Sequence, residues 1–345
     1  MSIGFFMMDI SIMFFPIASE TNNPYQLLID ATKYADKNGF SAVWIPERHF
    51  NSFGGIFPNP AVISAALAPI TKSIQLRAGS IISPLYDVLR IVENWSVVDN
   101  LSNGRIALSF GAGWSPDDFC LFPSRYKNRD SILYEQIQEI NILWSGGSIE
   151  RINGLDENKE IKFWPKPVQK KIPLWISIAS NPASFEKAGS FGANVLTHLV
   201  NQDLNGLKTN IDRYRAARKK SGHNPETGKV TLMLHTFVSS CTHEETLKIT
   251  EQPLKKYLAH IIDFGGVKAN NFSNNKITEE YKEELLHIAY KKFINGRVLI
   301  GNKKHCKEFL DKISNIGVTE IAALIDFGLP NQDVLKSLAL IKSLF

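Results

Sequence analysis

The sequence predicts an α/β fold and, within that class, a (β/α)8 barrel with insertions. Strand-like apolar segments alternate with helical segments along almost the whole chain, and eight strand segments can be assigned. The chain has 345 residues, a length that suits one barrel with insertions. We therefore expect a single barrel domain over residues 1–345. An open, doubly wound sheet with a small second domain is the alternative.

Each expected strand is a short apolar run bounded by turn-forming residues. The run that begins at Ile3 lacks the basic residues and the cleavage site of a signal peptide, so we interpret it as the first strand. In chain order, the expected strands are Ile3–Met8, Ser41–Ile45, Ile74–Ile82, Arg105–Phe110, Pro173–Ile178, Asn194–Val200, Lys229–Ser239 and Val318–Asp326.

The helices between these strands are predicted from apolar positions that recur at helical spacing. The first helix is expected over Pro24–Asn38, with Asn23 as its cap and Gly39 as its stop. The later helices are expected over Asn59–Pro69, Asp87–Leu101, Asp130–Trp144, Pro182–Gly189, the region of Leu204–Tyr214, His243–Ile262 and Val334–Leu344.

Two segments do not fit the minimal strand–helix repeat. Residues 146–171 are polar and rich in glycine, and residues 263–292 are rich in Asn and Lys. Neither has the composition of a domain linker, so we expect both to be insertions at an end of the barrel.

The bulk composition excludes several classes of protein. No apolar run approaches the roughly 20 residues of a membrane span, and three scattered cysteines argue against a disulfide scaffold or a cysteine zinc site. We expect a cytoplasmic protein. The net charge of +5 is mild, and the basic cluster Arg213–Lys220 is interpreted as a solvated helix face rather than a nucleic-acid site. An acidic partner is the alternative for that cluster.

In a barrel of this kind the chemistry lies on the loops that follow the carboxyl ends of the strands. The strand that ends at Phe110 continues into Gly111, Ala112, Gly113 and Trp114, where small residues allow close approach to the backbone. An ordinary strand–loop turn explains this motif equally well.

The second expected strand is followed by Glu47, Arg48 and His49, which combine a carboxylate, a fixed cation and an imidazole. Histidine is suited to proton transfer near neutral pH, and arginine can hold an anion. The structural alternative is a salt bridge between Glu47 and an arginine, with His49 capping the loop.

Three further strands end in candidate ligand contacts. Gly79 and Ser80 interrupt an apolar strand, as expected where a ligand or another backbone approaches closely. The turn from Ser180 to Ser184 leads into a helix N-terminus that can bind phosphate, although plain N-capping explains it equally well. His198 ends the next strand. With His235 it could form part of a metal site, but no third ligand has matching spacing, so no metal is expected.

Together, these stretches resemble the bacterial luciferase-like, flavin-dependent monooxygenase family. The matching motifs are W-I-P-E-R-H-F at 44–50, L-R-A-G-S-I-I-S-P at 76–84, R-I-V-E-N-W-S-V-V-D-N-L-S-N-G-R at 90–105 and G-A-G-W-S-P-D-D-F at 111–119. Within the family the chain looks most like the subgroup of polyketide and nonribosomal peptide biosynthesis. That similarity rests on F-W-P-K-P-V-Q at 163–169, N-V-L-T-H-L-V-N-Q at 194–202, Y-R-A-A-R at 214–218, M-L-H-T-F at 233–237 and L-I-D-F-G at 324–328.

The resemblance implies a TIM barrel that uses reduced FMN, supplied by a separate flavin reductase, and O2. Oxygen adds to the flavin, and the resulting peroxide oxidises the substrate. The catalytic residues implied are Glu47, Arg48 and His49. The implied cofactor contacts are Gly79 and Ser80, which match the family's cis peptide under the flavin, together with Gly111, Ala112, Gly113, Trp114, Ser180, Ser184 and His198.

Two departures bear on the substrate. Arg48 stands where luciferase has the histidine associated with proton transfer, and Gly111 and Ala112 stand where it has a reactive cysteine and an arginine. Light-yielding aldehyde oxidation is therefore not expected. The expected reaction is hydroxylation, or less readily Baeyer–Villiger insertion, of an acyl or aminoacyl group on a carrier protein or of a small molecule. The resemblance also implies a homodimer.

Two other functions stay open at this point. A deazaflavin (F420)-dependent hydride-transfer enzyme would keep the fold and change the chemistry. A non-catalytic flavin-binding partner subunit would keep the fold without the reaction.

Overall fold

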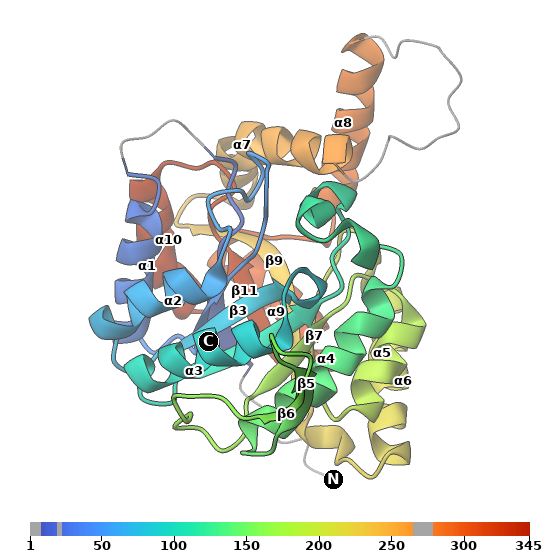
Figure 1. The fold of residues 1–345 in the computed structure, drawn as a ribbon. Coiled ribbons are helices and arrows are strands. Elements are labelled where there is room, and N and C mark those ends of the chain that lie inside the picture. Colours follow the sequence, from blue (N-terminus) through green and yellow to red (C-terminus); the bar gives the residue numbers. More distant parts are fainter. Residues whose placement is uncertain (1–7, 19–22, 265–278) are drawn as a thin grey trace.

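The computed structural model describes residues 8–18, 23–264 and 279–345. Eight parallel strands follow one another around a closed barrel, because β9 pairs with β8 and β11 while β11 pairs with β1 (Figure 1). The barrel strands are β1 (Asp9–Met13), β2 (Ala42–Ile45), β3 (Gln75–Ile82), β4 (Ile106–Gly111), β7 (Leu174–Ser177), β8 (Asn194–His198), β9 (Val230–Ser239) and β11 (Glu320–Leu324). The predicted barrel is confirmed, and the open-sheet alternative is wrong.

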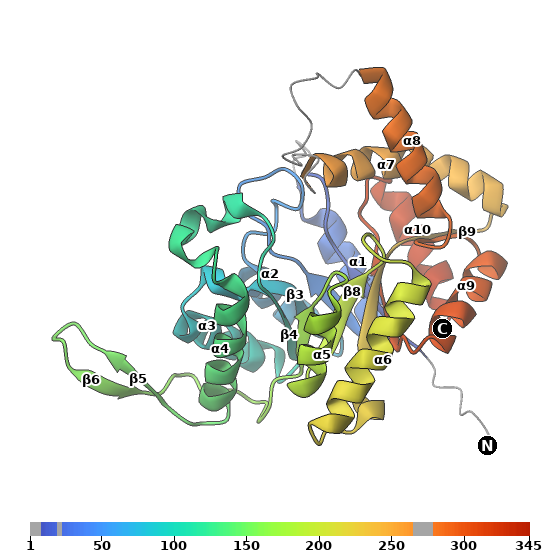
Figure 2. The ribbon, with the colours of Figure 1, turned by 90° about the vertical axis from the view of Figure 1, so that its right-hand side faces the viewer.

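The described helices are α1 (Gln26–Lys37), α2 (Pro60–Leu67), α3 (Val88–Ser102), α4 (Arg129–Trp144), α5 (Pro182–Ser190), α6 (Leu204–Lys220), α7 (His243–Phe264), α8 (Glu279–Ile294), α9 (Lys303–Asn315) and α10 (Asn331–Lys342). Most of them pack around the outside of the barrel, whereas α8 projects away from it beside α7 (Figures 1 and 2). Short 3-10 helices lie at 68–70, 83–85, 116–121, 123–125 and 225–227. Within the described ranges, no helix is long and apolar enough to cross a membrane.

The first described strand lies at Asp9–Met13, whereas the predicted strand Ile3–Met8 lies outside the described residues except for Met8. Its backbone pairs with β11 and β2, and the buried hydroxyl of Ser11 donates to the carbonyl of Ile321 at 3.0 Å. The prediction favoured the unbroken apolar run, whereas the actual strand contains a polar residue that finds its partner inside the barrel. Residues 1–7 lie outside the described part of the chain.

Several elements were not predicted. β10 (Leu299–Asn302) pairs with the end of β9, and α9 follows it directly. The segment 146–171 contains the hairpin formed by β5 (Ile149–Ile152) and β6 (Asn158–Ile161), which projects from the barrel in Figure 2. The segment 263–292 contains most of α8, and its residues 265–278 lie outside the described ranges.

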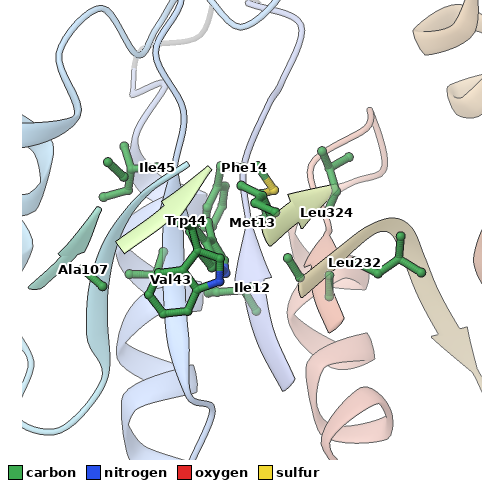
Figure 3. Packing of buried hydrophobic residues seen from close by; sticks show 14 of the residues in the cluster. Ile12, Met13, Phe14, Val43, Trp44, Ile45, Ala107, Leu232 and Leu324 are labelled. Carbon is green, nitrogen blue, oxygen red and sulfur yellow. The ribbon is translucent and has the colours of Figure 1, made fainter. Parts of the chain in front are cut away.

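Buried apolar side chains of β1, β2, β4, β9 and β11 pack closely together, as Figure 3 shows. The barrel also encloses a charged layer. The Arg77 guanidinium lies between the rings of Trp44 and Trp175, at 4.8 and 4.6 Å from their centroids, and donates to both oxygens of Glu320 at 2.8 Å. Because every charge in this layer has a partner, it is compatible with burial.

Candidate active site

The predicted site residues follow five strands that are neighbours in the barrel. The sheet order β2-β3-β4-β7-β8 places the loops after these strands side by side at one rim, since all the strands run parallel. Residues from 47 to 198, far apart in the chain, therefore converge at the carboxyl end of the barrel, where barrel enzymes carry their chemistry.

Glu47 lies at the centre of a buried hydrogen-bond cluster just beyond β2. Its Oε2 accepts the backbone N–H of Ile82 at 2.7 Å, and its Oε1 accepts from the Tyr86 hydroxyl and from His49 Nε2, the latter at 2.9 Å. Burial raises the pKa of Glu47, and the three donors oppose that shift. The carboxyl group is thus satisfied on both oxygens and fixed in orientation.

Arg48 pairs with a carboxylate that the sequence did not single out. Its Nη1 lies 2.6 Å from Asp118 Oδ2, and both side chains are buried. The Trp114 ring covers the guanidinium at 4.7 Å, while the ring itself is 52% exposed. The structural alternative of a salt bridge between Glu47 and an arginine is wrong, because Glu47 pairs with His49 and Arg48 pairs with Asp118.

The Gly79–Ser80 peptide bond is cis, as the resemblance implied. The pairing of β3 with β4 shifts register between Gly79 and Ile81, so Ser80 is an extra residue in a bulge. A Cβ on Gly111 would lie 2.9 Å from Ser80 Oγ. A side chain at position 111 would therefore displace the Ser80 hydroxyl from its present position.

The turn after β7 leads into α5, whose N-terminus faces the same rim. Asn181 caps the helix by accepting the N–H of Ala183 at 3.0 Å, so the N-capping interpretation is correct for this residue. The half-buried hydroxyls of Ser180 and Ser184 have no hydrogen-bond partner among the residues that the structure describes. Both hydroxyls are available to a bound anion.

The two strand histidines lie on neighbouring strands, His198 at the end of β8 and His235 within β9. His198 is half-buried at the end of β8, its Nδ1 accepts the N–H of Val200 at 3.2 Å, and burial lowers its pKa to about 4. Burial lowers the pKa of His235 to about 3, with a further contribution from His198. Over the described ranges, no group of three or more potential metal-ligating side chains occurs.

Two functional candidates were missed from the sequence. Asp118 is part of the motif G-A-G-W-S-P-D-D-F, but nothing local distinguished it from Asp117 as the buried partner of Arg48. Tyr86 follows a 3-10 turn after β3, and the sequence around it carries no signal of its contact with Glu47.

The basic cluster on α6 is largely structural. The side chains of Arg215 and Arg218 donate to backbone carbonyls of Pro225, Gly228, Asn224 and Ala193. Arg213 pairs with Glu186 on α5 at 3.0 Å. The interpretation of the whole cluster as a solvated face is therefore wrong for its two most buried arginines.

The sequence model of luciferase-like monooxygenases matches residues 8–320, which is most of the chain. The chain belongs to the luciferase-like monooxygenase family.

Relatives within the family include flavin-dependent oxygenases. The oxygenase component of a flavin-dependent trigonelline monooxygenase from Acinetobacter baylyi is 27% identical over 241 residues, covering 66% of this chain and 63% of that protein. The alpha chain of alkanal monooxygenase from Photorhabdus luminescens is 22% identical over 334 residues, covering 92% and 89%. This chain thus spans less than two thirds of the first relative and most of the second.

Solved structures confirm the luciferase-like barrel. The oxygenating constituent of 3,6-diketocamphane monooxygenase from Pseudomonas putida, a type II Baeyer–Villiger monooxygenase in complex with FMN, has a TM-score of 0.77 at 17% identity over 97% of both chains. An F420-dependent secondary alcohol dehydrogenase in complex with an F420–acetone adduct has a TM-score of 0.72 at 14% identity over 98% of both chains. At these identities the likeness concerns the fold alone.

Contacts within this protein account for the residues at three rim positions, namely 48, 111 and 113. Arg48 has a dedicated carboxylate partner in Asp118. A side chain at Gly111 would meet Ser80, and one at Gly113 would meet Ile82 and Phe119 at 2.7 and 2.9 Å. The departures from luciferase at Arg48 and Gly111 are therefore built into the packing of this rim.

Proposed function

We propose that this chain is the oxygenase component of a two-component monooxygenase that uses reduced FMN and O2 to hydroxylate its substrate. The observation that carries the proposal is one cluster at the carboxyl rim of a luciferase-like barrel. There, the buried Glu47–His49 pair, the bulge at Gly79–Ser80 and the N-terminus of α5 come from neighbouring strands.

The residues at this rim fit FMN. The Ser180 and Ser184 hydroxyls and the N-terminus of α5 offer donors to a phosphate, and the helix dipole favours its negative charge. In this proposal the flavin ring lies against Gly79 and Ser80, with Gly111–Trp114 and His198 as further contacts. The phosphate does not require a positively charged side chain on the turn before α5, because backbone N–H groups at a helix N-terminus stabilise an anion.

When bound, reduced FMN would supply the two electrons for the reduction of O2, so that one oxygen atom enters the substrate as a hydroxyl group and the other leaves as water. His49 exchanges a proton at the rim, and Glu47 holds its ring. The Arg48 guanidinium supplies a fixed positive charge beside this pair, and the Trp114 ring shields it from water.

The partner proposed is a flavin reductase that supplies reduced FMN. The trigonelline relative is itself named as an oxygenase component, which supports this arrangement. We propose as substrate an acyl or aminoacyl group on a carrier protein, or a small molecule of natural-product biosynthesis, with hydroxylation favoured over Baeyer–Villiger insertion. A cytoplasmic homodimer of single-domain chains completes the proposal.

The second candidate function is F420-dependent hydride transfer. The fold neighbour that carries an F420–acetone adduct favours it. The two candidates differ in their cofactor and in the need for O2, so a binding measurement separates them.

The test is an anaerobic titration of the protein with reduced FMN and, separately, with reduced F420, followed by mixing with O2. We expect reduced FMN to bind more tightly by at least about 1.4 kcal/mol, which is tenfold in Kd. Admission of O2 should then reoxidise the bound flavin with a rate that differs from that of free FMN. Tighter binding of reduced F420 would favour the hydride-transfer function instead. If the protein bound neither cofactor, both proposed functions would be wrong.

A further inference from the structure

The Glu47 side chain is fully buried, with 0% of it exposed, and three donors converge on it. Glu47 already accepts from the Ile82 N–H and from the Tyr86 hydroxyl, so we take the group as a carboxylate that also accepts from His49, and the proton in that contact belongs to Nε2. In the neutral imidazole, Nδ1 is then the unprotonated nitrogen. The His49 side chain is 10% exposed, so its ring lies at the border between the buried cluster and the rim.

Tyr86 controls whether Glu47 stays an acceptor. Its hydroxyl donates to Oε1, the same oxygen that His49 approaches. Burial, together with the charge of Glu47, raises the pKa of Tyr86 far above its ordinary value, so the hydroxyl acts as a donor near neutral pH. Such a donor favours the ionised form of the carboxyl group that it contacts.

Side chains from two further elements hold the backbone of Tyr86 in place. Its carbonyl accepts from Arg125 Nη1 at 2.7 Å and from Gln136 Nε2 at 2.8 Å, which lie in the 3-10 helix at 123–125 and in α4. The tyrosine is therefore anchored independently of Glu47. A residue fixed in this way transmits its own orientation to the side chain that it contacts.

We propose that Tyr86 is a positioning residue that acts through Glu47 to fix His49 in the Nε2–H tautomer, leaving Nδ1 as the atom that exchanges a proton at the rim. The role of that proton in oxygen chemistry rests on the proposed function, whereas the tautomer itself does not. Asp118 supports the same loop, since it accepts the backbone N–H of His49 as well as the Arg48 guanidinium.

The first measurement uses the unliganded protein labelled with 15N-histidine. Long-range proton–nitrogen correlation spectra, assigned to His49 with the variant His49→Gln, report which ring nitrogen carries the proton. We expect Nε2–H in the wild type and a mixture of tautomers in Tyr86→Phe. The control is Tyr214→Phe, which also removes a buried tyrosine hydroxyl, one that donates to the carbonyl of Ala193, and which should keep the wild-type spectrum.

The second measurement is the rate at which O2 reoxidises bound reduced FMN across pH. Tyr86→Phe should slow it by about tenfold and Glu47→Gln by about 100-fold, at FMN affinities within about twofold of the wild type. Tyr214→Phe should leave the rate unchanged.

An Nδ1–H tautomer in the wild type, or an unchanged Nε2–H tautomer in Tyr86→Phe, overturns the positioning role of Tyr86. Should Tyr86→Phe fold poorly, an unchanged tautomer in Glu47→Gln overturns the same role, because Tyr86 acts through Glu47. The spectra need no flavin. A protein that binds no FMN but shows the expected tautomers would therefore contradict the proposed function and leave the positioning role standing.

Discussion

Arg48 and Asp118 form a buried ion pair that joins the loops after two strands that are not neighbours. Arg48 follows β2, Asp118 lies in the 3-10 helix after β4, and β3 runs between them. The pair therefore spans the strand that carries Gly79 and Ser80. Burial raises the pKa of Asp118, and the Arg48 guanidinium opposes this shift.

Replacing Asp118 with asparagine should weaken this rim. Asp118→Asn keeps the shape and removes the charge that Arg48 contacts, so we expect the free energy of unfolding in urea to fall by about 3–5 kcal/mol. The neighbouring Asp117 is exposed and offers a matched control. Asp117→Asn should stay within about 0.5 kcal/mol of the wild type. Equal effects of the two variants would contradict the role of the ion pair.

The hydroxyls at the start of α5 should contribute to FMN affinity. A hydrogen bond to a charged group is worth about 1.5–3 kcal/mol, so Ser180→Ala or Ser184→Ala should raise the Kd for FMN by at least about tenfold. Ser190→Ala, at the other end of α5, removes a hydroxyl that donates to Glu186 and should leave the Kd unchanged. Riboflavin, which lacks the phosphate, should bind both serine variants and the wild type alike. If FMN and riboflavin respond in the same way, the phosphate lies elsewhere.

The bulge at Ser80 and the glycine at 111 should be energetically coupled. A Cβ on residue 111 would lie 2.9 Å from Ser80 Oγ, so Gly111→Ala forces that hydroxyl out of its place. We expect a loss of about 1–3 kcal/mol of stability, as for other overpacked positions. Ser80→Ala removes the obstructing atom, so the double variant should recover most of that loss. Additive effects in urea denaturation would show that the two residues do not touch.

The Arg77–Glu320 pair should account for a large part of the stability that the barrel loses at acid pH. Both groups are buried, and removal of one partner of such a pair typically costs about 3–5 kcal/mol, which we expect for Glu320→Gln. Burial alone would raise the pKa of Glu320, but Arg77 holds this pKa below its ordinary value. The pair's stabilisation is therefore present above about pH 4.3, the ordinary range of a glutamate, and is lost as the pH falls through the lowered pKa.

The measurement is urea denaturation of the wild type and Glu320→Gln from neutral to acid pH. The difference between the two proteins should shrink on the acid side of that range. A difference that is independent of pH would assign the loss to packing instead of charge. Glu150→Gln, on the exposed hairpin, is the surface control.

Sequence patterns predict β3, β8 and β9 even though each of these strands contains polar residues. They miss β1, whose Ser11 hydroxyl finds its partner in Ile321, which lies 310 residues away. They also fail at β10, which is four residues long and contains Gly301. In both cases the missing information is a partner that is distant in sequence.

The same limit applies to the candidate site: contacts between residues that are distant in sequence cannot be predicted from local patterns. Glu47 and His49 follow a predicted strand, Gly79 and Ser80 lie within another, and closure of the barrel then places them at one rim. The contacts of Tyr86 and Asp118 depend on how the loops fold over that rim, and no periodicity in the sequence encodes them.

The last prediction concerns His235, whose ring is enclosed by three aromatic side chains. Tyr257, Phe293 and Phe327 meet it edge-on at 4.7, 5.2 and 5.6 Å between ring centroids. Its Nε2 is buried without a hydrogen-bond partner among the described residues. Burial, with a further contribution from His198, lowers the pKa of His235 to about 3, so the folded protein keeps this ring neutral.

The sign of the pH effect follows from this lowered pKa. The unfolded chain binds a proton at its histidines near pH 6.5, whereas the folded chain does not until a much lower pH, so the stability due to neutral His235 is lost as the pH falls below about 6.5. Between about pH 7.5 and 5.5 the wild type should lose roughly 1 kcal/mol through this residue. His235→Phe keeps a ring among the three aromatic neighbours and removes the proton site. Its stability, measured by urea denaturation at both pH values, should fall less than that of the wild type by this amount. Parallel losses in the two proteins would mean that His235 is protonated in the fold, and the aromatic enclosure would then have to open.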